Sequence, residues 1–104
     1  MTKYEVLFSE QAQRDLKEIV IYLSLNLLEP NVAKDILSEI DKSILSLEEM
    51  PYRYCFVSDD LIKKAGIRKL IVKNYIVFFK VYEARKTVGI VRVMYGRRKW
   101  QKMI

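Results

Sequence analysis

The residues of this chain with the clearest chemical potential are cations. Residues 93–101 read VMYGRRKWQ, so Arg97, Arg98 and Lys99 follow a hydrophobic stretch that contains Tyr95. Guanidinium groups are planar, stay charged and bind phosphate or carboxylate through paired hydrogen bonds. Several phosphate contacts beside an aromatic platform would suit nucleic acid. The cationic run therefore indicates an anionic partner, with a solvated charged tail as the alternative.

The two halves of the chain carry opposite charge. Residues 1–50 hold five Lys or Arg against ten Asp or Glu, whereas the rest of the chain holds fourteen against three. The net charge of +6 therefore comes from the second half, which also contains Arg68, Lys69 and Lys73. We expect these cations to converge on one side of a sheet with Tyr95 and to face a polyanion or an acidic protein.

The residue inventory excludes several kinds of chemistry. The chain has no histidine, the usual general base, and its one cysteine, Cys55, can form neither an internal disulfide nor a thiolate cluster. Its three glycines are isolated, so no Gly-rich phosphate loop is present. The acidic pair Asp59 and Asp60 is interpreted as a turn. We expect no metal and no cofactor, and any phosphoryl chemistry would depend on cations that stabilise the transition state.

Two amphipathic helices are predicted in the first half of the chain. Residues 4–8 alternate briefly, as in a short strand, and Ser9 offers an N-cap for a helix over residues 9–26. Apolar residues recur every three or four positions in that helix and in a second one over residues 30–47, which stops before Pro51. Because the connection is short, we expect the two helices to pair as an antiparallel hairpin.

Three β-strands are predicted in the second half. Residues 67–72, 75–82 and 87–95 are rich in β-branched and aromatic side chains and are joined by short polar connections. In the first connection, Asn74 is expected to take the positive φ of a tight turn. The order of elements, β-α-α-β-β-β, predicts an α+β domain in which a short N-terminal strand and a helical hairpin precede a three-stranded antiparallel meander, as a single sheet packed on the helices.

Length and hydropathy predict one domain in the cytoplasm. The 104 residues suffice for a single core, and nothing divides residues 1–104 into two domains. The most hydrophobic stretch, residues 19–28, is interrupted by polar side chains and is shorter than the ~18 apolar residues of a membrane span. No basic and apolar leader precedes Tyr4, and Cys55 has no disulfide partner. We therefore expect a cytoplasmic protein that does not enter the membrane.

Four segments together resemble the RelE/ParE family of bacterial type II toxin–antitoxin toxins. They read YEVLFSEQAQRDLKEIVIYL, LSLEEMP, IRKLIVKNYIVFFKVY and VGIVRVMYGRRKW, in this order along nearly the whole chain. The resemblance implies a compact toxin that arrests growth when free. It also implies a cognate antitoxin, acidic and bound in a hetero-oligomer, and it places the basic C-terminal segment near the functional surface.

The family divides by target, and the resemblance leaves two targets open. RelE-like members are ribosome-dependent mRNA endonucleases, which use sheet cations and a C-terminal tyrosine. Lys69 and Arg98 match that set by position, with Arg68 beside them, but Ile76 stands where an arginine is expected and no tyrosine follows the basic run. ParE-like members inhibit DNA gyrase.

The long helical hairpin, with its spacing from Tyr22 to Val32, resembles the ParE-like branch, so gyrase inhibition is the leading prediction. The mRNA endonuclease is the alternative. A third possibility is a non-toxic module that binds its antitoxin and acts in transcriptional autoregulation.

The first helix carries the predicted antitoxin-binding residues, Tyr22, Leu25 and Leu28. Together with neighbouring apolar residues they exceed what one helix face can bury, and a sheet of this kind has an open edge to which a partner segment can add. The alternative is that these residues close the core of the hairpin itself.

Overall fold

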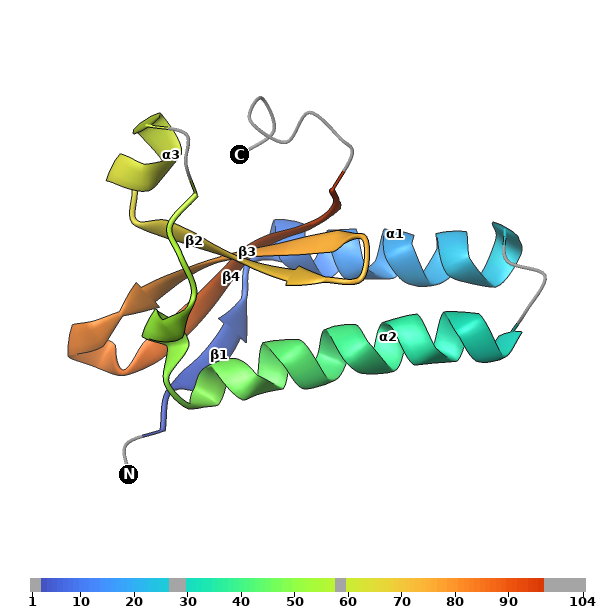
Figure 1. Ribbon diagram of the computed structural model, residues 1–104, viewed down its shortest axis with the longest axis horizontal. Helices are drawn as coiled ribbons and strands as arrows, with labels where there is room; N and C mark the ends of the chain where they lie inside the picture. The colour runs from blue at the N-terminus through green and yellow to red at the C-terminus, as the bar shows by residue number, and fades with distance from the viewer. Residues whose placement is uncertain (1–2, 27–29, 58–59, 97–104) are drawn as a thin grey trace.

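The computed structural model describes residues 3–26, 30–57 and 60–96 (Figure 1). The elements are, in order, β1 (Glu5–Phe8), α1 (Glu10–Asn26), α2 (Pro30–Leu45), the 3-10 turns η1 (Ser46–Glu48) and η2 (Pro51–Arg53), α3 (Asp60–Lys64), β2 (Ile67–Val72), β3 (Tyr75–Tyr82), the 3-10 turn η3 (Glu83–Arg85) and β4 (Thr87–Tyr95). The predicted α+β class, with a helical hairpin before a meander, is confirmed.

The meander forms as predicted, and its three strands have the predicted bounds. β2 pairs with β3 and β3 pairs with β4, both antiparallel. The N-terminal strand joins the same sheet beside β4, in parallel, so the strand order is β1-β4-β3-β2. The last strand of the chain is therefore an interior strand. It is flanked by β3 along its length and by β1 only over its first half, from Thr87 to Ile90.

The helical hairpin covers one face of the sheet, and its tips extend beyond the sheet (Figure 1). The main core lies between the two layers, where Ile19 of α1 and Ile40 of α2 meet Val77, Phe79 and other sheet residues. A second, smaller core lies on the opposite face, and consists of Val57, Ile62, Ile67, Phe78 and Met94. Both faces of the sheet are therefore apolar near its centre.

Helix α1 begins after the serine that the sequence predicted as its N-cap. The Ala12 amide donates to Ser9 Oγ at 3.0 Å, which makes Ser9 the N-cap. Along α1 the residues Ala12, Ile19 and Leu23 are buried, as the apolar spacing requires. Among the described residues, no helix is long and apolar enough to cross a membrane.

The structure corrects three local predictions. The second helix is α-helical to Leu45 and continues as the turn η1, not as one helix to residue 47. The stretch before β2, interpreted from sequence as irregular, contains α3, and Asp60 begins that helix instead of belonging to a simple turn. In the β2–β3 connection the positive φ, 55°, belongs to Lys73 and not to Asn74.

Candidate functional site

A buried ion pair joins α1 to β4 at the point where β1 ends. Arg92 donates to Asp15 from Nε at 2.7 Å and from Nη2 at 3.0 Å. The same carboxylate accepts the Val93 amide at 3.0 Å and the Gln11 side chain at 3.2 Å. Burial by itself would raise the pKa of Asp15, but the hydrogen bonds from Arg92, Val93 and Gln11 together lower it. Asp15 is therefore an ionised residue in the interface between α1 and the sheet.

This contact takes the place of strand pairing where β4 extends past the end of β1. Beyond Ile90 no strand of the described residues lies next to the outer edge of β4, and side chains of α1 and its N-cap bind the edge instead. Ser9 Oγ donates to the Val91 carbonyl at 2.8 Å, and Asp15 accepts the Val93 amide. Alternate amides of a strand point the same way, so the Tyr95 amide is directed towards the same edge. The last residues of β4 thus present a partly open strand edge beside α1.

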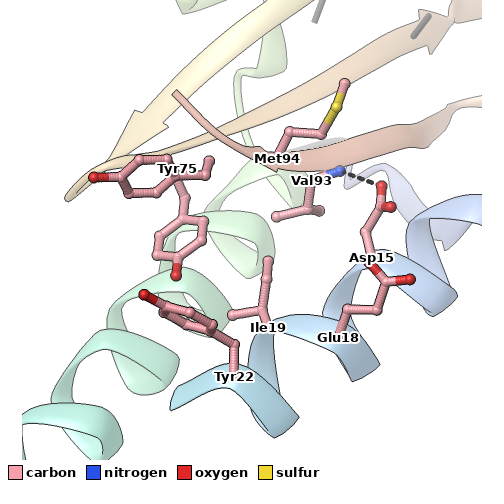
Figure 2. Close-up of a pocket in the computed structure, with 8 residues that line it drawn as sticks. Asp15, Glu18, Ile19, Tyr22, Tyr75, Val93 and Met94 are labelled. Carbon is pink, nitrogen blue, oxygen red and sulfur yellow. Dashed lines mark hydrogen bonds between the residues drawn. The ribbon is translucent and has the colours of Figure 1, made fainter. Parts of the chain in front are cut away.

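A groove lies between α1 and this open edge (Figure 2). Its volume is about 530 Å³, and it is lined by Asp15, Glu18, Ile19, Tyr22, Tyr75, Val93, Met94 and Tyr95. Figure 2 shows Ile19 and Tyr22 rising from the helix towards Tyr75 and Val93 of the sheet. The groove is therefore walled by one helix and one strand end, and its lining is mainly apolar and aromatic.

Tyrosines give the groove its character. The rings of Tyr75 and Tyr95 meet edge to face, with centroids 5.7 Å apart. Burial, followed by the neighbouring Tyr22 and Tyr95, raises the pKa of Tyr75, so its hydroxyl stays protonated at neutral pH. The groove thus offers apolar ring surface and the hydroxyl group of Tyr75, which suits a peptide more than a small charged metabolite.

The predicted antitoxin-binding residues lie at and beyond this groove. Tyr22 lines it and is 57% exposed, and Leu25, one turn further along α1, is 78% exposed. Leu28 lies outside the described residues. Leu23, in contrast, is buried and closes the hairpin core. Tyr22 and Leu25 therefore do not serve that core, which removes the alternative stated for these two positions.

The predicted cationic site is only partly assembled. Arg68 and Lys69 are consecutive strand residues, so their side chains leave opposite faces of the sheet. Arg68 lies opposite Phe79 in the register, whereas Tyr95 lies opposite Tyr75, several residues further along the sheet. The structure therefore does not bring Arg68, Lys69 and Tyr95 together on one side.

Lys73 is the member of that set that does approach the end of β4. It lies in the β2–β3 turn, and the next residue accepts the Gly96 amide through its carbonyl at 2.7 Å. Arg97, Arg98 and Lys99, which complete the predicted set, lie outside the described residues. Their roles stay predictions. In the sequence they come directly after Gly96, whose amide binds the turn that contains Lys73.

The surroundings of Lys69 bear on an RNase site. Lys69 lies opposite Phe78, on the face away from α1 and α2. Two positions along on the same face, Ile71 lies opposite Ile76, and Ile71 is 65% exposed. The residues next to Lys69 are therefore apolar where a ribonuclease of this kind would need further cations. Among the described residues, no group of three His, Cys, Asp or Glu is placed to hold a metal.

Asp15 and Arg92 were not predicted as site residues, although the sequence carries a signal for them. Asp15 falls on the apolar stripe of its helix, between Ala12 and Ile19, where a charged residue needs a buried partner. Arg92 interrupts a strand of otherwise apolar residues. Two opposite charges at apolar positions predict a buried pair, but the sequence does not show that they meet.

Solved structures with the same fold come from toxin–antitoxin systems. The chromosomal ParDE system of Pseudomonas aeruginosa matches with a TM-score of 0.68 and 18% identity, over 91% of this chain and 98% of that one. The RelBE2 complex of Mycobacterium tuberculosis matches with a TM-score of 0.63 and 23% identity, over 91% and 93%. The intact Escherichia coli RelBE complex matches with a TM-score of 0.57 and 18% identity, over 91% and 99%.

The fold is thus that of small toxins from type II toxin–antitoxin systems. A model of the family described as the ParE toxin of the type II toxin–antitoxin system parDE matches residues 6–100. The chain therefore belongs to the ParE toxin family, and the resemblance inferred from its sequence is confirmed. A search of curated proteins gave no match.

Proposed function

We propose that this toxin arrests growth by inhibiting DNA gyrase in the cytoplasm. The observation that carries the proposal is the apolar pair of Ile71 and Ile76 beside Lys69. RNA cleavage without a histidine base depends on several cations around the scissile phosphate, and one missing preorganised donor costs about 3 kcal/mol of transition-state stabilisation. An apolar face at these positions suits contact with a protein target better than phosphoryl chemistry.

Membership of the ParE family supports the same target, because the matching family model is described as the toxin of the parDE system. The length of the helical hairpin also agrees, since α1 has seventeen residues and ends at Asn26, and α2 begins at Pro30 and has sixteen.

Two assays on the same preparation test the target. Toxin released from its antitoxin is added to purified gyrase in a supercoiling assay, and to a translation reaction analysed by primer extension. We expect loss of supercoiling and no new cleavage in translated messages. Cleavage with intact supercoiling would instead support the mRNA endonuclease, with Lys69, Arg68 and Arg98 as its catalytic residues. Expression without growth arrest would support a non-toxic module of transcriptional autoregulation.

The proposal includes a cognate antitoxin that occupies the groove between α1 and β4. The open edge at Tyr95 can accept an extended segment by strand addition, and the rings of Tyr22 and Tyr75 can receive its apolar side chains. Lys73 lies in the β2–β3 turn at the same end of the sheet, on the β3 side of β4, so acidic residues of an antitoxin segment that extends past this end would be favoured. A partner that is both acidic and amphipathic fits this arrangement, and the complex is a hetero-oligomer.

Charge introduced on the helix tests this surface. Leu25→Asp and Leu28→Asp should preserve folding and prevent neutralisation, because each places a carboxylate where the acidic antitoxin needs apolar contact. Growth is measured on co-expression with the antitoxin gene, and folding by circular dichroism. Full neutralisation of both variants would place the antitoxin elsewhere.

A further inference from the structure

A second ordered surface lies at the other end of the sheet, around the β3–β4 connection. Figure 1 shows this connection on the side of the molecule away from the tips of α1 and α2. Glu83 in this connection accepts hydrogen bonds at Oε2 from the hydroxyls of Tyr4, at 2.6 Å, and Tyr52, at 2.7 Å. Its Oε1 accepts the ammonium group of Lys86. Three separate parts of the chain therefore meet at one exposed carboxylate.

These contacts fix the ring of Tyr52. The hydrogen bonds from Lys86, Tyr4 and Tyr52 lower the pKa of Glu83 to about 2, so the carboxylate is ionised at any physiological pH. The hydrogen bond to Glu83 in turn raises the pKa of Tyr52 to about 12. The Tyr4 and Tyr52 rings pack edge to face with centroids 6.3 Å apart. Tyr52 is thus held as a neutral ring, and 47% of its surface remains exposed.

Arg68 contacts this ring and a second one. Its guanidinium carbon is 5.1 Å from the centroid of Tyr52 and 4.0 Å from the centroid of Phe56, and Nη1 donates to the Tyr54 carbonyl at 2.7 Å. The backbone fixes the same geometry, because Phe56 forms a β-bridge with Arg68 at the outer edge of β2. The side chain of Arg68 is therefore pre-ordered before any partner binds.

No carboxylate among the described residues pairs with Arg68, so its positive charge is not neutralised. Within the part of the chain that the structure describes, the recorded ion pairs use Arg14, Lys86 and Arg92, and Arg68 has no carboxylate partner. Its guanidinium group has five N–H donors, and the Tyr54 carbonyl takes one position. The contacts with the two rings do not neutralise its charge, and its remaining N–H donors lie at the edge of the planar group. That edge is the part that binds a planar anion through two hydrogen bonds.

We infer that Arg68, with Tyr52 and Phe56, is an anchor that binds a carboxylate side chain of a protein partner. Arginine and tyrosine are the residue types over-represented at the energetic centres of protein interfaces, and Phe56, 40% exposed, adds an apolar wall. A bound carboxylate would lie beside two rings that limit the access of water, where a charge-assisted hydrogen bond is stronger than in solvent. The inference rests on the proposed function in one respect: the partner is the toxin's protein target.

A nucleic-acid strand fits this surface less well. Backbone binding needs a row of cations, because affinity grows with each neutralised phosphate. Here the neighbouring Lys86 is already neutralised by Glu83, whose own charge lies close to the Tyr52 hydroxyl. Of the guanidinium groups near Tyr52 and Tyr54, Arg53 donates to Ser46 Oγ at 2.9 Å, and Arg68 lies beside two rings. Two arginines are fewer cations than a repeating phosphate chain requires, so the surface suits a single acidic side chain better.

The surface around Arg68 lies away from the groove between α1 and β4 that is proposed for the antitoxin. Arg68 is opposite Phe79, which is opposite Ile90, whereas the groove lies at Tyr75 and Tyr95. A partner at Arg68 can therefore be tested with variants that leave the groove intact.

The test uses an octaglutamate peptide and an eight-residue oligothymidylate, each titrated into the full-length protein and followed by fluorescence anisotropy. Arg68→Lys keeps the net charge but removes the bidentate edge. We expect it to weaken octaglutamate binding at least tenfold and to leave oligothymidylate binding unchanged. The matched control is Arg53→Lys, whose guanidinium carbon is 5.0 Å from the Tyr54 ring centroid, and which should bind both probes like the native protein.

A second variant guards against loss of folding. Phe56→Leu leaves Arg68 in place but removes one of the two aromatic rings that contact it. It should weaken octaglutamate binding by a smaller factor than Arg68→Lys does, with an unchanged circular dichroism spectrum. Equal octaglutamate binding by the native protein and Arg68→Lys overturns the inference, as does a loss confined to oligothymidylate. A gyrase supercoiling assay runs in parallel: its failure with the native protein rejects the proposed target, while the peptide titration still decides the role of Arg68.

Discussion

Asp15 of α1 and Arg92 of β4 form a two-point ion pair at 2.7 and 3.0 Å, in the place where β1 has stopped pairing with β4. Asp15 is only 4% exposed, and the same carboxylate binds the Val93 amide. One side chain thus satisfies a strand edge, neutralises a cation and sets the distance between helix and sheet. That distance defines the groove.

Removing the charge of Asp15 should destabilise the fold strongly. Asp15→Asn leaves Arg92 partly buried without its acid, and breaking a buried pair in this way costs about 3–5 kcal/mol. The free energy of unfolding is measured by urea denaturation. Glu10→Gln is the control, because Glu10 and Arg14 are exposed and 3.9 Å apart, and its effect should stay below about 0.5 kcal/mol. Similar losses in the two variants would show that the pair does not hold α1 to the sheet.

Acid should weaken the contacts at the β3–β4 connection. The pKa of Glu83 is lowered from 4.5 to about 2 by Lys86, Tyr4 and Tyr52. A depressed pKa in the folded state means that the stabilising contribution is fully present above pH 4.5 and is lost as pH falls towards 2. We therefore expect the urea midpoint of the native protein to fall more than that of Glu83→Gln over this interval. Parallel curves for the two proteins would assign the acid sensitivity to other groups.

Truncating Tyr22 should weaken antitoxin binding without unfolding the toxin. Tyr22 lines the groove and is 57% exposed, so Tyr22→Ala removes partner contact and little core packing. We expect at least a tenfold rise in the dissociation constant of the antitoxin complex, measured by isothermal titration calorimetry. Ile21→Ala is a matched control, since Ile21 is also 57% exposed on α1 but does not line the groove. Equal effects of the two substitutions would argue against the groove.

Toxicity should depend on the cations of the second half of the chain. Arg98→Ala is expected to reduce growth arrest, and Arg68→Ala combined with it should abolish the arrest. Both residues are predicted to contact the target, and each substitution by alanine removes a guanidinium group with its positive charge and its paired hydrogen-bond donors. Colony counts after induction measure the effect, with protein levels compared by immunoblot. Undiminished toxicity of the double variant would show that the basic half does not act on the target.

Several elements of the fold were predictable because their signals are local. β2, β3 and β4 have the bounds expected from β-branched and aromatic runs, and Ser9 caps α1 as expected from its position before an amphipathic stretch. The short connection between α1 and α2 predicted their hairpin. The turn was less well predicted: asparagine favours positive φ in general, yet Lys73 takes it here and Asn74 does not.

The candidate site was predictable only in part. The surplus of apolar residues on α1 correctly indicated exposed side chains, and Tyr22 and Leu25 are exposed. The convergence of Arg68, Lys69 and Tyr95 was wrong, because neighbouring strand residues alternate between faces and the register places Arg68 far from Tyr95. The sequence shows which residues are charged, but not which part of the sheet each charged side chain occupies.

The sequence by itself determined the order of strands and helices, the amphipathic hairpin and the concentration of positive charge in the second half. These depend on residues within a turn or a few positions of one another. The tertiary structure decided that β1 lies in parallel beside β4, that Asp15 meets Arg92 across 77 positions, and that Tyr52 and Phe56 both contact Arg68. Such contacts depend on how the layers pack, and local patterns carry no information about which distant partners that packing brings together.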